Sequence, residues 1–548
     1  MLKFRGFLFL YRGLCIMAVL GMTGGCSPQQ YKADADKEVY NVIDSKWKNS
    51  FGQKNNYRVS DTAPSPNDVN IANASVPSGA INLAQAAAMA TANNRDYQTR
   101  KETLYLSALD LTLTRHQYTL QWFGTVDGGY VKKGANANPA TLPAGSREED
   151  VSVSSESGGT FKQILAGGTI VSTRLAIDWL RFLTGDPRTS LGSVLSASVT
   201  MPLLGSGAGK VEREKLTLAE RSVLYQIRNF NRYRQTFVVS IVNDYYRVLQ
   251  LRDGAANAEN NYKMVAESKE RLEMEAQAGR RNRFEVDQAE QNMLTAKDGY
   301  VQAQQAYEQA LDSFKISLSL PADANVELDQ NELRALENIG ITQPDYTLDM
   351  AVETALLRRL DLANSADSID DSLRSVILAT DGLGTELNLL GSASVNSKEK
   401  TEFDNLQFHR GTYGLGFEAD LPFDRKAERN AYRRALINLE QSRRQYENDM
   451  EEVKLSVRKA YRQLREAAER HKIQVKSLDL ARSRVESTSL LLEAGRLTTR
   501  DLLDSQNALL QAQNNVTAAL VDHIIAKLSF FQDVGILQVK PDGMWQEQ

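Results

Sequence analysis

Two long stretches of this chain align with each other, without a gap, at a constant offset of 216 residues. Under this offset Tyr245 falls on Tyr461, and the Ala-Gly-Arg run at 278–280 falls on the identical run at 494–496. Because solenoid repeats have periods of about 20 to 50 residues, we interpret the longer offset as the duplication of one large unit. The sequence therefore predicts a fold with two pseudo-equivalent halves.

Each half contains one exceptionally long segment with the pattern of a helix. Residues 209–278 and 426–493 contain no proline, so we expect each to form one helix about 100 Å long at about 1.5 Å per residue. From 439 to 492 mostly apolar residues recur at alternating spacings of four and three, which is the period of a coiled-coil seam. Shorter helices are expected to return over 284–320 and 500–534, so each half should contain a helical hairpin.

Ahead of each hairpin, the pattern predicts a shorter helix followed by strands. The shorter helices are expected over residues 83–117 and from residue 348. In the segment 415–421, apolar residues alternate with Gly, Glu and Asp, which is the period of a strand. We predict four strands per chain, two in each half, at 122–130, 195–201, 386–395 and 415–421. Pro202 and Pro422 are expected to end the second strand of each half.

The alternating strands have one apolar face and one polar face. A soluble antiparallel sheet that packs one face on a core shows the same alternation. Here the strands bring no second apolar layer, and aromatic residues gather near the strand ends, as in the interfacial girdles of membrane barrels. A four-stranded sheet in lipid would leave two unpaired edges, so several copies must combine their strands into one closed barrel. The segment 132–190 is longer than a surface loop requires, and we expect an exposed loop with extra strand there.

The first residues have the layout of a secretory signal. Lys3 and Arg5 precede an apolar run, and Gly24-Gly25 stands directly before Cys26. Small residues before a cysteine resemble a bacterial lipoprotein cleavage site, which implies lipidation of Cys26. An ordinary cleaved signal with an incidental cysteine is the alternative. Residues 27–80 are polar and contain several prolines, so we expect an extended tether or a segment that lies along the protein surface.

Composition and motifs give no support for catalysis or nucleic-acid binding. The 65 Lys and Arg residues nearly balance 69 Asp and Glu residues, which leaves a net charge of -4. The glycine-rich run at 205–210 resembles a phosphate-binding loop, but Val211 stands where such a loop needs Ser or Thr. The 4 His residues are far apart, and no hydrolase or zinc motif was found. We therefore expect no enzyme activity, no cofactor and no metal site.

From about residue 83 to residue 534, this arrangement resembles the TolC-like outer-membrane efflux protein family. The resemblance rests on the repeated halves, the strand pairs, the Gly-Arg turn after each long helix, and the run Asp-Leu-Leu-Asp-Ser-Gln-Asn-Ala at 501–508. It implies a mainly α fold with a membrane β-barrel part, in which a homotrimer forms a 12-stranded barrel and an α-helical tunnel. It also implies an exit duct that passes solutes from a periplasmic adaptor and an inner-membrane pump to the exterior.

The expected organisation combines the repeat with this resemblance. It comprises a signal peptide (1–25), a lipidated N-terminal tether (26–82), a first repeat (83–320), a connecting equatorial segment (321–346), a second repeat (347–535) and a C-terminal tail (536–548). The expected location is the outer membrane of a Gram-negative-type bacterium, with a lipid anchor and a large periplasmic part. A non-conducting periplasmic coiled-coil lipoprotein that tethers envelope components is the alternative, and it would need no lipid-facing strands.

The resemblance also assigns a pore constriction to acidic residues six and nine positions after the second tip glycine, Gly495. These residues are Asp501 and Asp504, and three copies of each would form a negative ring that favours cations. Asp501 also fits a helix-capping box with Thr498, so capping is an alternative role for it. Asp504 is not explained by capping.

Family members tie their closed state with a basic residue two positions after the second tip glycine, but this chain has Leu497 there. We therefore expect Arg496 or Arg500 to pair with Glu285 near the first tip. The alternative for Glu285 is a capping box with Asn282. The residues that the resemblance assigns to adaptor docking are Gly279, Arg280 and Gly495. For the arginine, the alternative is an ordinary solvated charge.

Overall fold

The computed structural model describes residues 27–54, 56–60, 80–132, 151–165, 168–182, 189–204, 208–342, 345–398, 402–421, 423–494, 496–540 and 543–546. The expected signal peptide, Cys26, Pro422 and Gly495 lie outside these residues. The chain divides into two compact units. The first contains Met1–Trp47, Tyr105–Leu224 and Ile377–Tyr432, and the second contains Lys48–Leu104, Tyr225–Val376 and Arg433–Gln548. In the described residues, none of the helices has the length and apolar character that a membrane crossing needs.

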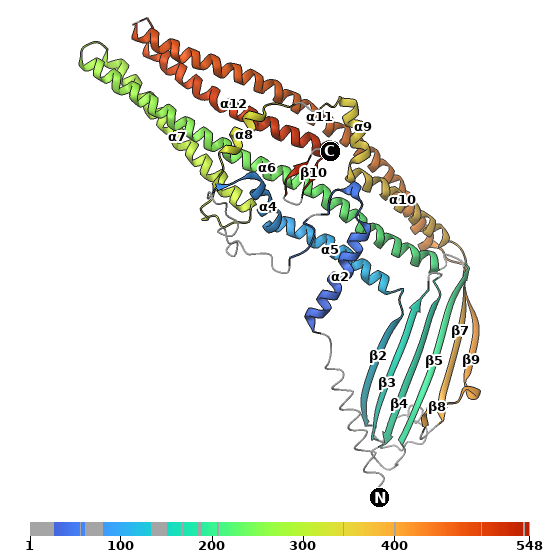
Figure 1. Ribbon diagram of the computed structural model, residues 1–548. Coiled ribbons are helices and arrows are strands. Elements are labelled where there is room, and N and C mark those ends of the chain that lie inside the picture. Colours follow the sequence, from blue (N-terminus) through green and yellow to red (C-terminus); the bar gives the residue numbers. More distant parts are fainter. Residues whose placement is uncertain are drawn as a thin grey trace, which may run out of the picture. The chain divides into compact units, whose positions relative to one another are not determined.

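The first unit contains an antiparallel sheet of long strands (Figure 1). Its order is β2-β3-β4-β5-β7, and both β9 and the short β8 pair with the remaining edge of β7. The bounds are β2 Gln121–Lys132, β3 Val151–Ile164, β4 Ile170–Phe182, β5 Thr189–Leu204, β7 Glu386–Lys398, β8 Glu402–Leu406 and β9 Thr412–Asp420. The short turn η4 (Phe408–Arg410) precedes β9.

The prediction of four strands per chain is wrong. The four expected strands are present as β2, β5, β7 and β9, but β3 and β4 stand between β2 and β5. Both come from residues 132–190, where we expected an exposed loop with extra strand. Of the 14 residues of β3, four are Ser and two are Gly. Few apolar residues therefore stand at alternate positions, and the sequence gives little indication of a strand there.

Strand β5 also continues past Pro202, where we expected it to end. It runs to Leu204, and its register against β7 shifts between Pro202 and Leu204. A bulge of this kind accommodates a residue that has no N–H to donate to the neighbouring strand.

The expectation of an extended tether is wrong for the segment that forms helix α2 (Pro28–Lys46). The Ser27 hydroxyl caps its first turn by accepting a hydrogen bond from the Gln30 backbone N–H at 3.3 Å. Val39, Val42 and Ile43 are buried along one side of the helix. These three residues have helical spacing, but they are few within a polar segment, so the helix signal in the sequence is weak.

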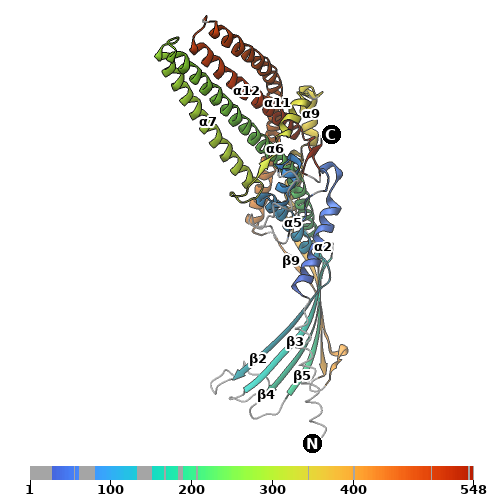
Figure 2. The same ribbon diagram turned by 60° about the vertical axis from the view of Figure 1, so that its left-hand side comes forward.

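Two helical hairpins form as predicted, and Figures 1 and 2 show each returning helix alongside its long helix. Their bounds are α6 Ala208–Gln277 with α7 Arg283–Ser317, and α11 Lys426–Glu493 with α12 Thr499–Val534. Rings that are 216 positions apart in the sequence make the same contact in both hairpins. Tyr245 lies 5.9 Å from Phe314, and Tyr461 lies 6.0 Å from Phe530, between ring centroids.

The helices expected ahead of the strands are each divided in two. They are α4 Leu83–Asn93 with α5 Arg95–His116, and α9 Leu348–Arg358 with α10 Leu360–Asp381. Asn94 separates the first pair and Arg359 the second, and the Asn94 side chain accepts a hydrogen bond from the Tyr97 backbone N–H at 3.0 Å. The remaining elements are η1 Asn49–Phe51, β1 Ala80–Ile81, β6 Glu327–Leu328, α8 Asn331–Ile339, β10 Gln538–Val539 and β11 Trp545–Gln546.

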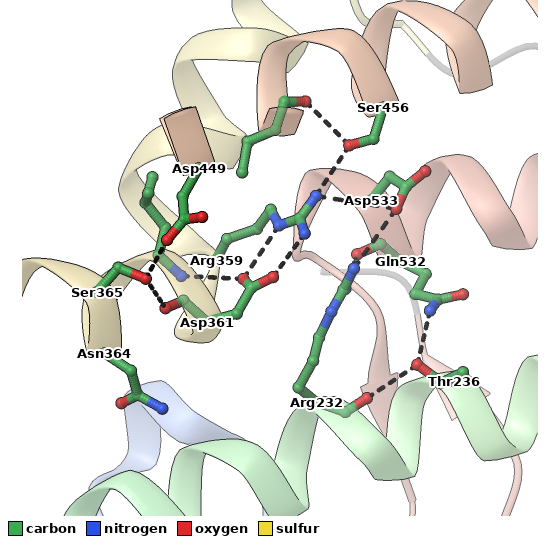
Figure 3. Close-up of polar contacts among 12 residues, drawn as sticks. Arg232, Thr236, Arg359, Asp361, Asn364, Ser365, Asp449, Ser456, Gln532 and Asp533 are labelled. Atoms are coloured by element: carbon green, nitrogen blue, oxygen red, sulfur yellow. Dashed lines mark hydrogen bonds and ion pairs between the residues drawn. The ribbon is translucent and has the colours of Figure 1, made fainter. Parts of the chain in front are cut away.

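A charged cluster within the second unit surrounds the break between α9 and α10 (Figure 3). The Arg359 guanidinium donates two hydrogen bonds to the Asp361 carboxylate, at 2.6 and 3.1 Å, and one to the Ser456 hydroxyl at 2.9 Å. The Asp533 carboxylate lies 4.0 Å from Arg359 and 3.4 Å from Arg232 on α6. Four helices, α6, α10, α11 and α12, therefore contribute to one polar cluster.

The electrostatic balance of this cluster favours the charged form of Asp361. Burial alone would raise the pKa of Asp361, but the hydrogen bonds and charge of Arg359, with the charge of Arg232, hold it below the usual value. The cluster therefore stabilises the charged form of this carboxylate relative to its protonated form.

Candidate gate at the hairpin tips

The first hairpin turns in a backbone geometry that favours glycine. Gly279 has a φ of 72°, in the left-handed region, and the Arg280 backbone N–H donates to the Glu275 carbonyl oxygen at 2.9 Å. In the second hairpin the Arg496 backbone N–H donates to the Leu491 carbonyl oxygen at 2.8 Å. Since 491 and 496 are 275 and 280 plus the offset of 216, both tips end their long helix with the same hydrogen bond.

Glu285 joins the two hairpins near their tips. Its carboxylate accepts a hydrogen bond from the Thr499 hydroxyl at 3.2 Å and one from the Arg281 guanidinium at 3.3 Å. Arg281 also pairs with Glu275 at 3.0 Å. Thr499 is only 2% exposed, so the hydroxyl that bridges the hairpins lies in a buried position at the start of α12.

This arrangement differs from the pairing expected for Glu285. In the described residues Glu285 pairs with neither Arg496 nor Arg500, because Arg281, four residues earlier on the same hairpin, already occupies its carboxylate. Arg500 lies 3.9 Å from Asp504 instead. The capping alternative for Glu285 is also wrong, since the Asn282 side chain makes no capping hydrogen bond.

Asp501 does form the capping box that was one of its two expected roles. Its carboxylate accepts from the Thr498 backbone N–H at 3.0 Å, and the Thr498 hydroxyl accepts from the Asp501 N–H at 3.4 Å. The Thr498 hydroxyl and backbone N–H, which donate to this carboxylate, hold the pKa of Asp501 below its usual value. Asp501 is therefore a structural charge at the start of α12, whatever else it does.

Asp504, near the second tip, takes no part in the capping box. Its side chain is 61% exposed, and among the described residues its carboxylate pairs with Arg500 at 3.9 Å. An exposed pair at this distance holds neither side chain firmly. The Asp504 carboxylate is thus accessible from solvent and only loosely held.

Two residues at this site were not identified from the sequence. Arg281 lies four positions before Glu285, a spacing that favours an ion pair on one helix, so a signal for it existed. Thr499 carried no such signal, because its role depends on how the two hairpins pack. The described residues contain no group of three or more His, Cys, Asp and Glu placed to hold a metal ion.

Replacing Thr499 with Val is expected to loosen the tips, because it removes the hydroxyl that donates to Glu285 and keeps the shape of the side chain. A hydrogen bond to a charged group near the surface contributes on the order of 1 kcal/mol, which corresponds to about fivefold in an opening equilibrium. Hydrogen-deuterium exchange should therefore accelerate about fivefold in peptides that cover 283–289 and 499–505. Thr295→Val is the control, because the Thr295 hydroxyl bonds only within α7. Equal exchange in both variants would contradict a bridging role.

A comparison with protein families found a match for part of the chain that carries these tips. Residues 351–529 match the family described as outer membrane efflux protein. The resemblance to TolC-like outer-membrane efflux proteins is confirmed. The matched segment includes strands β7 to β9, all of α11 and most of α12. A comparison with curated protein sequences found no match.

Solved structures of outer-membrane channels have the same fold. The CmeC channel of Campylobacter jejuni is 14% identical with a TM-score of 0.60, over 91% of this chain and 93% of that chain. The OprN channel is 15% identical with a TM-score of 0.59, over 89% and 99%. The open state of the MtrE channel of Neisseria gonorrhoeae is 13% identical with a TM-score of 0.59, over 83% and 88%. The chain therefore has the fold of an outer-membrane efflux channel.

Proposed function

We propose that this protein is the outer-membrane exit duct of a tripartite efflux or secretion system. Three copies enclose one passage, and solutes reach it from an inner-membrane pump through a periplasmic adaptor. The observation that carries this proposal is the exposed apolar face of the strand sheet. Leu415 and Phe417 on β9 are 77% and 67% exposed, which is unfavourable in water and favourable in lipid.

A second apolar stripe on α11 supports assembly of several copies. Val453, Val457 and Leu464 are buried along the coiled-coil seam. On the opposite side of the helix, four large apolar residues are exposed at separations of 18, 7 and 11 residues, each within about 20° of whole turns. These residues are Leu455, Ile473, Leu480 and Leu491. A helix with one covered and one exposed apolar face is what a closed ring of hairpins requires.

The proposed location is the outer membrane of a Gram-negative-type bacterium, with a lipid anchor on Cys26 and the hairpins in the periplasm. The tips at Gly279-Arg280 and Gly495-Arg496 are the proposed docking points of the adaptor. Asp504 lines the proposed constriction, and Asp501 adds charge there while it caps α12. The Glu285–Thr499 contact holds the hairpins together in the resting state.

Conductance in planar bilayers tests the channel and its constriction together. We expect cation-preferring currents from the purified protein, and Asp504→Asn should reduce the preference for cations about threefold because it removes three charges from a narrow ring. Asp504 is chosen over Asp501 because its replacement leaves the helix cap intact. Glu337→Gln on α8 is the control, since it removes an equal number of charges from an exposed position outside both hairpins.

Two outcomes would contradict the proposal. Equal cation preference in wild type and Asp504→Asn would show that Asp504 does not line the constriction. Absence of current from the wild type and also from Thr499→Val, whose tips should be looser, would favour a non-conducting periplasmic tether.

A further inference from the structure

The hairpin of β3 and β4 continues the two faces of the sheet without interruption. One row of residues crosses all six long strands in register. It consists of Trp122, Phe161, Thr173, Ala197, Ala393 and Tyr413. The neighbouring row, on the opposite face, consists of Gln121, Lys162, Ser172, Ser198, Ser392 and Gly414. Apart from Thr173, the first row is apolar and has aromatic residues at both edges, and the neighbouring row is polar apart from its glycine.

Strand β4, like β9, exposes an apolar side chain on one face of the sheet and a charged side chain on the other. On β4, Leu175 is 42% exposed on the apolar face, while Arg174 is exposed on the polar face. On β9, Leu415 is exposed on the apolar face, while Glu418 is exposed on the polar face. The Ser172 and Ser198 hydroxyls, 2.7 Å apart, join β4 to β5 on the polar side. A hairpin that served as a plug or an external flap would have no need for matched faces.

The ends of the sheet allow copies to join edge to edge. In the part of the chain that the structure describes, no strand pairs with the outer edge of β2 or of β9. Five antiparallel pairings separate these two strands, so β2 and β9 run in opposite directions. An antiparallel pairing of β9 with β2 of the next copy therefore continues the alternation. The six strands have 12, 14, 13, 16, 13 and 9 residues, and about 9 suffice to cross a bilayer.

We propose that β3 and β4 are part of the barrel wall, so that three copies close a barrel of 18 strands. This inference rests on the trimeric channel proposed above and goes beyond it, because four strands per copy would close on 12. Barrel diameter grows with strand number, so this wall is about 1.5 times as wide. With a strand spacing of about 4.8 Å and a tilt of about 40°, the backbone diameter is about 36 Å rather than about 24 Å. The exit is then wide enough to hold an aqueous lumen lined by the polar row.

Cysteine labelling in proteoliposomes tests which side of the wall β4 presents. Cys15 and Cys26 are the two cysteines of the sequence, so the wild-type protein reports the background. A charged maleimide should label Arg174→Cys at least about tenfold faster than Leu175→Cys, because a thiol in lipid forms little thiolate. Glu418→Cys and Leu415→Cys on β9 form the matched control pair, and they should show the same difference.

The control pair separates failure of this inference from failure of the channel. If the β9 pair differs but Leu175→Cys reacts as fast as Arg174→Cys, the hairpin lies outside the wall, and the 18-strand barrel is wrong although the channel stands. If Leu415→Cys is also labelled rapidly, neither strand faces lipid and both proposals fail. Electron cryomicroscopy of the detergent-purified complex then counts the strands directly, and a closed ring of 12 would overturn the inference even if the labelling agreed.

Discussion

An arginine in place of Leu415 is expected to prevent stable assembly of this protein in the outer membrane. Leu415 lies next to the middle of β9, its side chain is exposed, and it belongs to the apolar face of the sheet. An arginine on the lipid face near the bilayer centre costs about 2 to 4 kcal/mol, so three copies cost about 6 to 12 kcal/mol. The amount of trimer in outer-membrane fractions, measured on semi-native gels, should fall at least tenfold.

Glu418→Arg is the matched control, because it places the same side chain three residues away on the polar face of the same strand. It should leave the amount of trimer close to that of the wild type, since a lumen position keeps the charge in water. Equal amounts of trimer in both variants would mean that the two faces of β9 do not differ in environment, and the lipid-facing assignment would be wrong.

Arg359→Ala is expected to lower the free energy of unfolding of the second unit by about 1 to 3 kcal/mol per copy, because it leaves the carboxylates of Asp361 and Asp533 without one of their partners. Asp361 remains 42% exposed, which places the effect in the lower part of that range. Thermal unfolding followed by circular dichroism should show a lower midpoint at pH 7. Lys454→Ala, which breaks an exposed pair with Glu451 on α11, should change the midpoint little.

The effect of Arg359→Ala on stability is also expected to depend on pH. The folded-state pKa of Asp361 is lowered, so its stabilising contribution is complete above the unfolded value of about 3.9 and is lost as the pH falls through the folded value. Arg359→Ala removes most of that lowering. The stability difference between wild type and variant should therefore narrow below about pH 4. A difference that stays constant down to pH 2 would show that Asp361 does not titrate as part of this cluster.

Periodicity predicted the helical part of the fold well because each signal extends over many residues. Helix α11 has the predicted bounds, and α6, α7 and α12 agree within a few residues. The strands were harder, since a strand offers only a few alternations and β3 carries Ser and Gly where apolar residues would reveal it. The helix α2 was missed for a similar reason, because its buried residues are few within a polar segment.

The roles of the residues at the hairpin tips could be predicted from the sequence only in part. Capping by Asp501 follows from local spacing alone, so the sequence contained enough information to predict it. The partner of Glu285 on α12 depends on the packing of two hairpins that are 214 residues apart at the contact, and no local pattern encodes it. The same holds for Arg359, whose partners come from α10, α11 and α12.

The β3–β4 hairpin is inserted between β2 and β5 in a way that leaves the direction of both strands unchanged. The first residue of β2 and the last residues of β5 lie at the same end of the sheet, because Gln121 aligns with Lys162, Ser172 and Ser198. A chain that crosses two extra times returns to that end with its direction unchanged, so the helices before and after it need no adjustment. In the trimeric barrel proposed above, gain or loss of one β-hairpin per copy would therefore change the width of the barrel in steps of six strands and leave the helical hairpins unchanged.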